Sequence, residues 1–419
     1  MSHKTLRPGT RAGTLTASRP SQPAAHPDRS NGKGPFMQHG VQTETQEAPG
    51  PRTATRGERA SALDRSTEIV PVLMAGGFGT RLWPLSTPDR PKQFLTEWQD
   101  RSLFQQAWDR ALQLAPAGHV LVMTSASLAP FVQDQAPDLP PENLVLEPLR
   151  RDTGPAAVLA ALVAARRWPE AVMAIFPSDH FIGNEWAFGE TVAAAVDRAK
   201  GGGLGTIGIS PASPATRFGY LHLHQPPEPL VPQPVHAFVE KPDRDRAEAY
   251  LATGRYLWNS GIFIWQARAL LEAARRHLPE TCAALAGVAE HVGQTAFGRR
   301  AKDAFEQIEA VSVDYGIMEK ASDVWCVPAS FEWDDVGGWL AAERLLPADA
   351  NGNRIHGQVY VDTVTGCVVV GTPTHPLAVA GLTDCIVVHG DAGTLVCHKS
   401  AADRIKPIIE QILRGDQRY

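Results

Sequence analysis

At 419 residues, 43% of them hydrophobic, the chain is long enough for two or more domains with sizeable cores. Its formal net charge of −5 gives no reason to expect a nucleic acid or an anionic membrane as a partner. The five cysteines lack CxxC spacing, which indicates neither a zinc site nor a disulfide framework and favours a cytoplasmic location.

Residues 1–66 are rich in Pro, Ser, Thr, Gly and Arg and hold almost no large apolar side chains. Such a segment buries too little surface to offset its ordering entropy, so we expect a disordered tail. Its basic first half is compatible with a transit peptide, but scattered Pro and Gly argue against an amphipathic helix. Met37 is an alternative start, and the apolar run of a signal peptide is missing.

From Glu68 onward, short apolar segments alternate with helix-like ones. The expected strands are 69–74, 119–125, 143–148, 171–180 and 204–210, and the expected helices are 102–115, 154–168 and 187–200. This alternation predicts an α/β domain over 67–350, with a Rossmann-like, mixed and mostly parallel sheet covered by helices on both faces. The most apolar later stretch, 156–165, is too short to span a bilayer, so no membrane partner is expected.

After "DANGNR" (349–354) the sequence pattern changes: short Val-rich runs are separated by turn residues, and no helical pattern lies between them. We expect a small all-β unit over 351–419 that resembles a solenoid coil. A final amphipathic stretch, 400–413, predicts a helix, although Pro407 argues against it.

The segment "AGGFGTRLWPLSTPDRPKQF" (75–94) follows the first strand directly. Glycines there let the backbone turn tightly and let an anion approach its N–H groups. Neither the Walker A pattern nor GxGxxG is present, since Leu82 occupies the place of the last glycine. The alternative to an anion site is a tight turn with solvated cations.

The extended pattern, Gly-Gly-x-Gly-x-Arg-Leu with Pro-Leu-Ser and Pro-Lys after it, resembles the signature of sugar-1-phosphate nucleotidylyltransferases. "RPKQFL" is similar to the form in mannose-1-phosphate guanylyltransferases. This resemblance implies the nucleotide-diphospho-sugar transferase fold and transfer of GMP from GTP to mannose 1-phosphate. It implies that Arg81 neutralises the β- and γ-phosphates and that Lys92 reaches the α-phosphate. The implied nucleotide-binding loop comprises Ala75, Gly76, Gly77, Gly79 and Thr80.

Two aspartates are candidate Mg²⁺ ligands. "FPSDH" places Asp179 just past a buried strand, and "FEWDDVGGW" places Asp335 in the family's Trp-x-Asp-x-Gly pattern. Carboxylates at such places suit Mg²⁺, and the resemblance implies that these two hold it. Taken alone, Asp179 is equally suited to capping the next turn. Asp334 is expected to point elsewhere, as a solvated carboxylate.

The implied sugar-phosphate site comes from three further motifs. In "FVEKP", the resemblance implies that Lys241 pairs with the sugar phosphate and that Glu240 binds a hydroxyl, where the alternative is an exposed ion pair. "WNSGIF" adds Asn259 as a second hydroxyl partner, and "RFGYLHL" adds Gly219, whose backbone would approach the sugar. In "SVDYGIMEK", Asp314 is expected to be mostly structural.

Base recognition is implied by "EPLRRDTGPAA", with Glu147, Asp152 and Thr153 near the nucleobase. This chain has Asp152 where Asn is usual and Gly154 where Ala is usual. An ionised Asp only accepts hydrogen bonds, which suits the N–H donors of guanine. Asp152 or Thr153 is equally suited to capping a helix that starts near Pro155.

The resemblance covers 68–413, and no further isomerase domain is expected. The alternatives are another hexose 1-phosphate or nucleotide as substrate, and a non-catalytic sugar-nucleotide sensor of the same fold. An oxidoreductase is disfavoured by the missing GxGxxG. The oligomeric state stays open, with a homodimer as one option.

Overall fold

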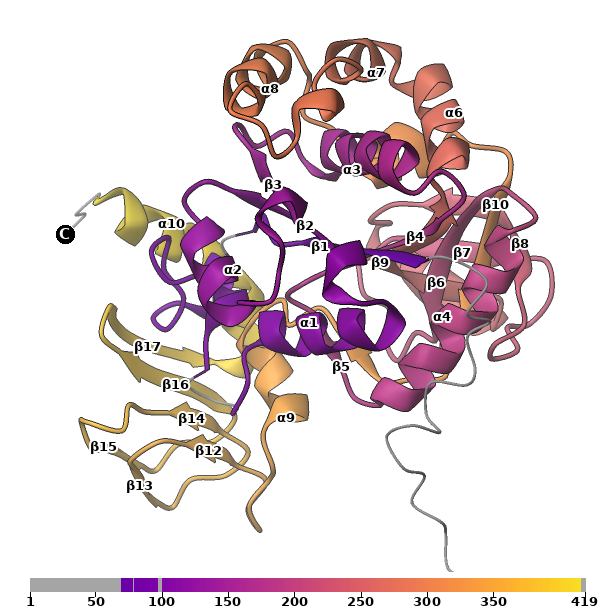
Figure 1. The fold of residues 1–419 in the computed structure, drawn as a ribbon. Coiled ribbons are helices and arrows are strands. Elements are labelled where there is room, and N and C mark those ends of the chain that lie inside the picture. Colours follow the sequence, from indigo (N-terminus) through magenta and orange to yellow (C-terminus); the bar gives the residue numbers. More distant parts are fainter. Residues whose placement is uncertain (1–68, 78, 97–99, 416–419) are drawn as a thin grey trace, which may run out of the picture. The chain divides into compact units, whose positions relative to one another are not determined.

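The computed structural model describes residues 69–77, 79–96 and 100–415. The expected tail, 1–66, lies outside the described residues. Figure 1 shows the arrangement of the helices and strands. No helix of the described segments is long and apolar enough to cross a membrane.

The main sheet has nine strands in the order β3-β2-β1-β4-β9-β6-β10-β8-β7. β1 to β4 are mutually parallel, β10 is parallel to β6, and β9 runs antiparallel to both β4 and β6. The bounds are β1 Ile69–Met74, β2 Leu121–Ser125, β3 Leu144–Glu147, β4 Val172–Pro177, β6 Leu204–Ile209, β7 Tyr220–Leu223, β8 Gln233–Val239, β9 Tyr256–Gln266 and β10 Val324–Pro328. The sheet is therefore mixed with a parallel half, as expected.

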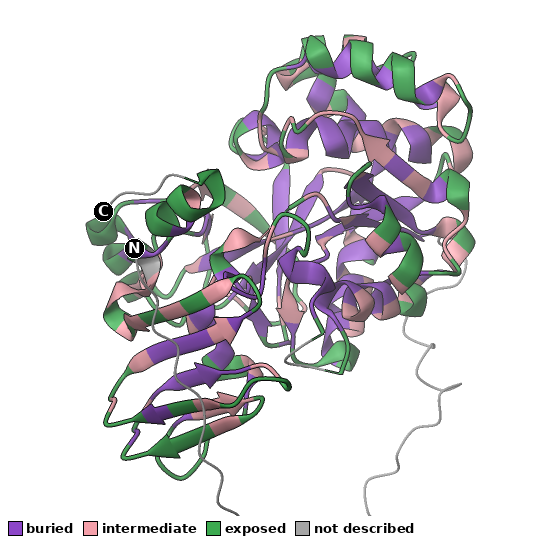
Figure 2. Cartoon of the chain, turned by 90° about the vertical axis from the view of Figure 1, so that its left-hand side faces the viewer, coloured by how far each residue is buried: buried purple, intermediate pink, exposed green. Residues whose placement is uncertain are grey.

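Helices cover both faces of this sheet (Figure 1). Ile69 and Leu73 of β1 pack with α1 (Leu103–Leu114), α2 (Ala129–Gln135) and α4 (Glu185–Ala199). Val70 and Val72 face the other way, because side chains alternate along a strand. Helices on that second face are α3 Thr153–Arg167, α6 Ala267–His277, α7 Pro279–Leu285 and α8 Phe297–Glu306. Figure 2 shows the strands buried and the outer helix faces exposed.

The antiparallel half of the sheet closes on itself, since β7 pairs with both β8 and β9. Its interior is filled by Leu221, Leu223, Leu257 and Cys326. Helix α5 (Arg244–Thr253) follows β8, and a short ribbon of β5 (Phe181–Ile182) and β11 (Trp333–Asp334) lies apart from the main sheet. This ribbon joins the segment that follows β4 to the segment that follows β10.

The C-terminal strands stack as a coil. β12 (Arg354–His356), β14 (Val368–Val370) and β16 (Cys385–Gly390) are parallel and in register, and β17 (Gly393–His398) closes that sheet antiparallel. β13 (Val359–Asp362) pairs in parallel with β15 (Leu377–Ala380) on another side of the coil. Parallel stacking of short strands confirms the predicted solenoid-like architecture.

Two short helices flank this coil, α9 (Ala342–Leu345) and α10 (Lys406–Arg414). Of the helix expected over 400–413, only the second half is α-helical, as α10, and Lys399–Arg404 form a 3-10 helix. Pro407 lies in the first turn of α10, where a missing N–H is tolerated. Ile405 and Ile409 pack into a cluster with Leu82, Trp83 and the strands of the coil. The coil is thereby packed against the segment that follows residues 75–80, which we call the glycine loop.

We expect the Ser102→Ala variant to lose about 1–2 kcal/mol of unfolding free energy. Ser102 caps α1 in a reciprocal capping box with Gln105, and its hydroxyl also donates to Gln135 Oε1 at 2.5 Å. Urea denaturation measures the change, with exposed Ser213→Ala as the control. A loss no larger than that of the control would show that the capping box contributes nothing.

Candidate active site

The glycine loop is held by bonds to its carbonyl groups. Gln93 Nε2 donates to Gly77 O at 2.7 Å, and Arg150 Nη2 donates to Gly76 O at 3.0 Å. Gly79 has φ 56°, and an added Cβ would lie 2.4 Å from Lys92 Cβ, so only glycine fits there. The loop therefore has a fixed shape, with Lys92 pressed directly against it.

Lys92 lies at the centre of the site and is only 4% exposed. Its Nζ contacts Asp179 Oδ2 at 2.7 Å and donates to the carbonyl oxygens of Asp335 and Val336 at 3.0 and 3.2 Å. An ammonium group has three N–H donors, and these contacts use all three. Lys92 thus ties the segment after β4 to the segment after β11.

Of the two candidate metal ligands, Asp179 contacts Lys92 with its carboxylate and Asp335 contacts it with its backbone carbonyl. Burial opposes ionisation of Asp179, but the ammonium of Lys92 and the imidazole of His180 outweigh it and lower the pKa of this carboxyl. Asp335 Oδ1 lies 3.3 Å from Nη2 of Arg217. Each of the two carboxyl groups therefore has a cationic neighbour, Lys92 for Asp179 and Arg217 for Asp335.

Arg81, the second cation of the loop, is exposed and donates to Gly337 O at 3.3 Å. Gly337 follows Asp335 by two residues, so Arg81 and Lys92 contact the same segment. The structure thus brings together Arg81, Lys92, Asp179 and Asp335, which lie far apart in the sequence.

The expectation of a solvated Asp334 is wrong. Asp334 is 3% exposed, and its carboxylate accepts the N–H of Val336 at 2.7 Å and pairs with Arg344. Successive side chains in an extended segment point to opposite sides, so Asp334 and Asp335 face different surroundings. The expected direction away from Asp335 holds, but Asp334 is a buried structural carboxylate.

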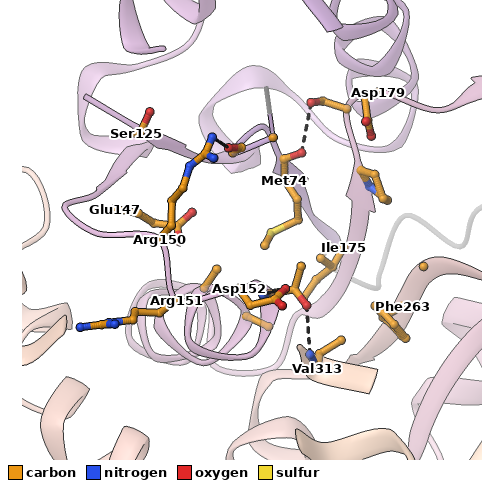
Figure 3. A pocket seen from close by; sticks show the side chains of 18 of the residues that line it. Met74, Ser125, Glu147, Arg150, Arg151, Asp152, Ile175, Asp179, Phe263 and Val313 are labelled. Atoms are coloured by element: carbon orange, nitrogen blue, oxygen red, sulfur yellow. Dashed lines mark hydrogen bonds between the residues drawn. The ribbon is translucent and has the colours of Figure 1, made fainter. Parts of the chain in front are cut away.

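A cavity of about 430 Å³ extends from the glycine loop toward α3. Figure 3 shows Glu147, Arg150 and Asp152 around it, with Asp179 across from them. Burial raises the pKa of Glu147 to about 7, and Arg150 offsets only part of this effect. Glu147 therefore exists in both protonation states near neutral pH and is able to donate as well as accept a hydrogen bond.

Asp152 and Thr153 both have structural partners in this cavity. Asp152 caps α3 with φ 66°, its Oδ1 accepting the N–H of Thr153 at 2.7 Å, and the helix begins at Thr153, one residue before the expected range of 154–168. Thr153 Oγ1 accepts the N–H of Val313 at 3.0 Å. Positive φ in a non-glycine residue costs energy, and such strain gathers at ligand sites.

The expected sugar-phosphate residues form a second group. Lys241 Nζ pairs with Glu240 Oε1 at 2.8 Å, with Lys241 half exposed and Glu240 nearly buried. An added Cβ on Gly219 would lie 2.4 Å from Glu240 Oε2 and 3.4 Å from Asn259 Cβ. Gly219 is therefore needed because the Glu240 carboxylate packs on it, next to Asn259.

Sequence reasoning missed three residues that shape the site: Arg217, Arg150 and Gln93. Each lies inside a motif already singled out, beside a residue that was chosen. Their contacts are to Asp335, Gly76 and Gly77. The sequence offered one indication for each of them, namely a charged or amide side chain next to a residue of the motif.

Comparison with known proteins agrees with this geometry. Residues 70–351 match the family model described as nucleotidyl transferase, and 356–412 match the MannoseP isomerase/GMP-like beta-helix domain. The xanthan biosynthesis protein XanB of Xanthomonas campestris is 35% identical over 348 residues, which are 83% of this chain and 73% of XanB. Mannose-1-phosphate guanylyltransferase of Escherichia coli K12 is 35% identical over 361 residues, 84% of this chain and 75% of that protein.

A crystal structure from Thermus thermophilus, described as mannose-1-phosphate geranyltransferase, has a similar fold. It superposes with a TM-score of 0.74 at 31% identity, over 83% of this chain and 99% of that one. The nucleotidyl transferase model spans well over half of the chain, and it includes the glycine loop and both aspartates of the site. The chain belongs to the nucleotidyl transferase family.

Proposed function

We propose that the protein transfers GMP from GTP to mannose 1-phosphate, giving GDP-mannose and pyrophosphate. The observation that carries the proposal is that Lys92, packed on the glycine loop, contacts the carboxylate of Asp179 and the backbone carbonyl of Asp335, while Arg81 contacts the same segment at Gly337. Relatives named mannose-1-phosphate guanylyltransferase support this choice of substrates.

The proposed reaction is an in-line attack of a sugar-phosphate oxygen on the α-phosphorus of GTP. The attacking oxygen is already an anion, so no general base is needed. The barrier comes from bringing two polyanions together, and a site with fixed positive charge lowers it. Arg81, Lys92 and Lys241 supply such charge.

The roles expected from the sequence carry over as proposals. The nucleotide would be bound by Ala75, Gly76, Gly77, Gly79, Thr80, Arg81, Lys92, Glu147, Asp152 and Thr153. The sugar phosphate would be bound by Gly219, Glu240, Lys241 and Asn259. Because Lys92 uses all three donors on the protein, we propose that it first acts by positioning the two carboxylate segments.

Asp179 and Asp335 would hold Mg²⁺. Within the described residues, no group of three or more His, Cys, Asp and Glu side chains is placed to bind a metal ion. Two carboxylates fit Mg²⁺ nonetheless, because this ion usually takes one or two carboxylates plus substrate phosphates and water. When bound, it would add positive charge beside the phosphates.

A pyrophosphate-release assay with GTP, mannose 1-phosphate and Mg²⁺ tests the function, and we expect turnover that EDTA abolishes. The same assay with ATP, UTP and dTTP and with glucose 1-phosphate tests specificity. Equal or better turnover with one of these pairs would contradict the choice of substrates. Tight sugar-nucleotide binding without turnover would favour the non-catalytic sensor instead.

We expect Asp335→Asn to lower kcat on the order of a thousandfold, since it removes a charge from the proposed metal site. Asp334→Asn should stay within about tenfold of wild type in kcat. It should lower the melting temperature, because it weakens the ion pair that the buried Asp334 makes with Arg344. Steady-state kinetics and thermal melts of the two variants measure this. An inactive Asp334→Asn beside an active Asp335→Asn would reverse the assignment.

We expect Lys92→Met to lose about 2 kcal/mol or more of unfolding free energy, because it leaves Asp179 without its counter-charge. The two backbone carbonyls on Lys92 would lose their donor as well. Urea denaturation measures the change, and exposed Lys200→Met serves as the control, expected within about 0.5 kcal/mol of wild type. Equal stability of the two variants would rule out the positioning role of Lys92.

A further inference from the structure

Asp314, expected from the sequence to be mostly structural, lines the cavity of the candidate active site. It begins a π-helical turn, η6 (Asp314–Met318), a rare element that is frequent at functional sites. Its Oδ1 accepts a hydrogen bond from Asn259 Nδ2 at 2.7 Å. Asp314 is thus joined directly to a residue of the proposed sugar site.

The orientation of the Asn259 amide is fixed by its other contacts. Its Oδ1 lies 3.3 Å from the backbone N of Gly261 and 3.0 Å from the hydroxyl of Thr206. A backbone N–H only donates, so the atom facing Gly261 is the amide oxygen and the NH₂ group faces Asp314. Asn259 therefore presents one N–H to Asp314 and keeps a second for a ligand.

The ionised form of the Asp314 carboxyl group is unfavourable in its surroundings. Burial and the nearby carboxylate of Glu240 raise its pKa to about 6, in spite of Asn259 and Lys241. This pKa lies above the value of 3.8 for a free Asp, so the folded state loses stability relative to the unfolded state as pH rises from 4 to 6. A residue that only supported the fold would be better as a neutral amide, and such costly groups cluster at functional sites.

The neighbours of Asp314 approach the same place from other elements. The Glu240 carboxylate packs on Gly219 next to Asn259. The N–H of Glu240 donates to Oε1 of Glu319, which belongs to the same "SVDYGIMEK" segment as Asp314. The carboxylates of Asp314 and Glu240 and the amide of Asn259 therefore lie near Lys241, the proposed partner of the sugar phosphate.

We propose that Asp314 accepts a hydrogen bond from a hydroxyl of the hexose 1-phosphate and, with Asn259, selects among sugars. The proposal rests on the proposed function. An ionised carboxylate only accepts and the spare Asn259 N–H only donates, so the pair suits two neighbouring hydroxyl groups. A site built around such a group rejects an analogue that lacks the hydroxyl, because the carboxylate is then left unpaired.

Kinetics of Asp314→Asn, a variant of nearly the same shape, test this role. We expect KM for mannose 1-phosphate to rise about tenfold to a hundredfold, with KM for GTP within twofold of wild type. In a series of deoxy-mannose 1-phosphates, one analogue should give wild type and variant the same kcat/KM. At pH 8 the variant should melt no lower than wild type, since it removes the unfavourable carboxylate. Exposed Asp303→Asn is the control and should change nothing.

An unchanged KM for the sugar phosphate would overturn the proposal. A lower melting temperature with both substrates impaired would also overturn it, in favour of a structural role. A rise confined to GTP would assign Asp314 to the ribose hydroxyls instead. Wild-type protein without turnover on any hexose 1-phosphate and nucleotide would overturn the proposed function, and this role with it.

Discussion

The site depends on one buried cation. The ammonium of Lys92 is almost fully removed from water, so each of its three donors needs a protein acceptor. Those acceptors are the Asp179 carboxylate and two carbonyls that lie more than 240 residues further along the chain. Gly79 is pressed against the same side chain, so the loop, the two aspartate segments and the lysine have little freedom to move independently.

The C-terminal coil packs against the segment that contains Trp83 and Leu85, next to Arg81. Trp83 and Leu85, just after Arg81, pack closely on Gly393 and Gly390 of β17 and β16, where an added Cβ would clash with them. The indole N–H of Trp339 donates to the carbonyl of Trp83 at 2.9 Å. The coil therefore buries segments next to Arg81 and the Asp335 segment and adds to their rigidity, which is what a preorganised charged site requires.

Charge is divided unevenly across the site. Lys92 outweighs the effect of burial and lowers the pKa of the Asp179 carboxyl, and the Asp335 carboxylate pairs with Arg217. In the cavity, by contrast, burial raises the pKa of Glu147 and of Asp314, and nearby cations only partly compensate. The first region suits phosphates and a metal ion, and the second suits neutral groups that donate hydrogen bonds, such as base N–H and sugar hydroxyl groups.

Local patterns in the sequence determined much of this protein. The apolar run of β1 was predicted with its observed bounds, and the alternation of strands and helices predicted the layered sheet. The glycine loop and the aspartates were singled out because the motifs that carry the family resemblance are short, local stretches of the chain. Helix α3 begins at Thr153, one residue before the expected range, and of the two cap candidates it is Asp152 that provides the cap.

Only the tertiary structure decided which of these groups meet. Nothing in "FEWDDVGGW" shows that Asp334 turns inward to Arg344 while Asp335 lies beside Arg217. Nor does "SVDYGIMEK" show that Asp314 is bound by Asn259, 55 residues away. Secondary structure follows from propensity and periodicity over a few residues, whereas the partner of a buried charge is set by how distant segments pack and exclude water.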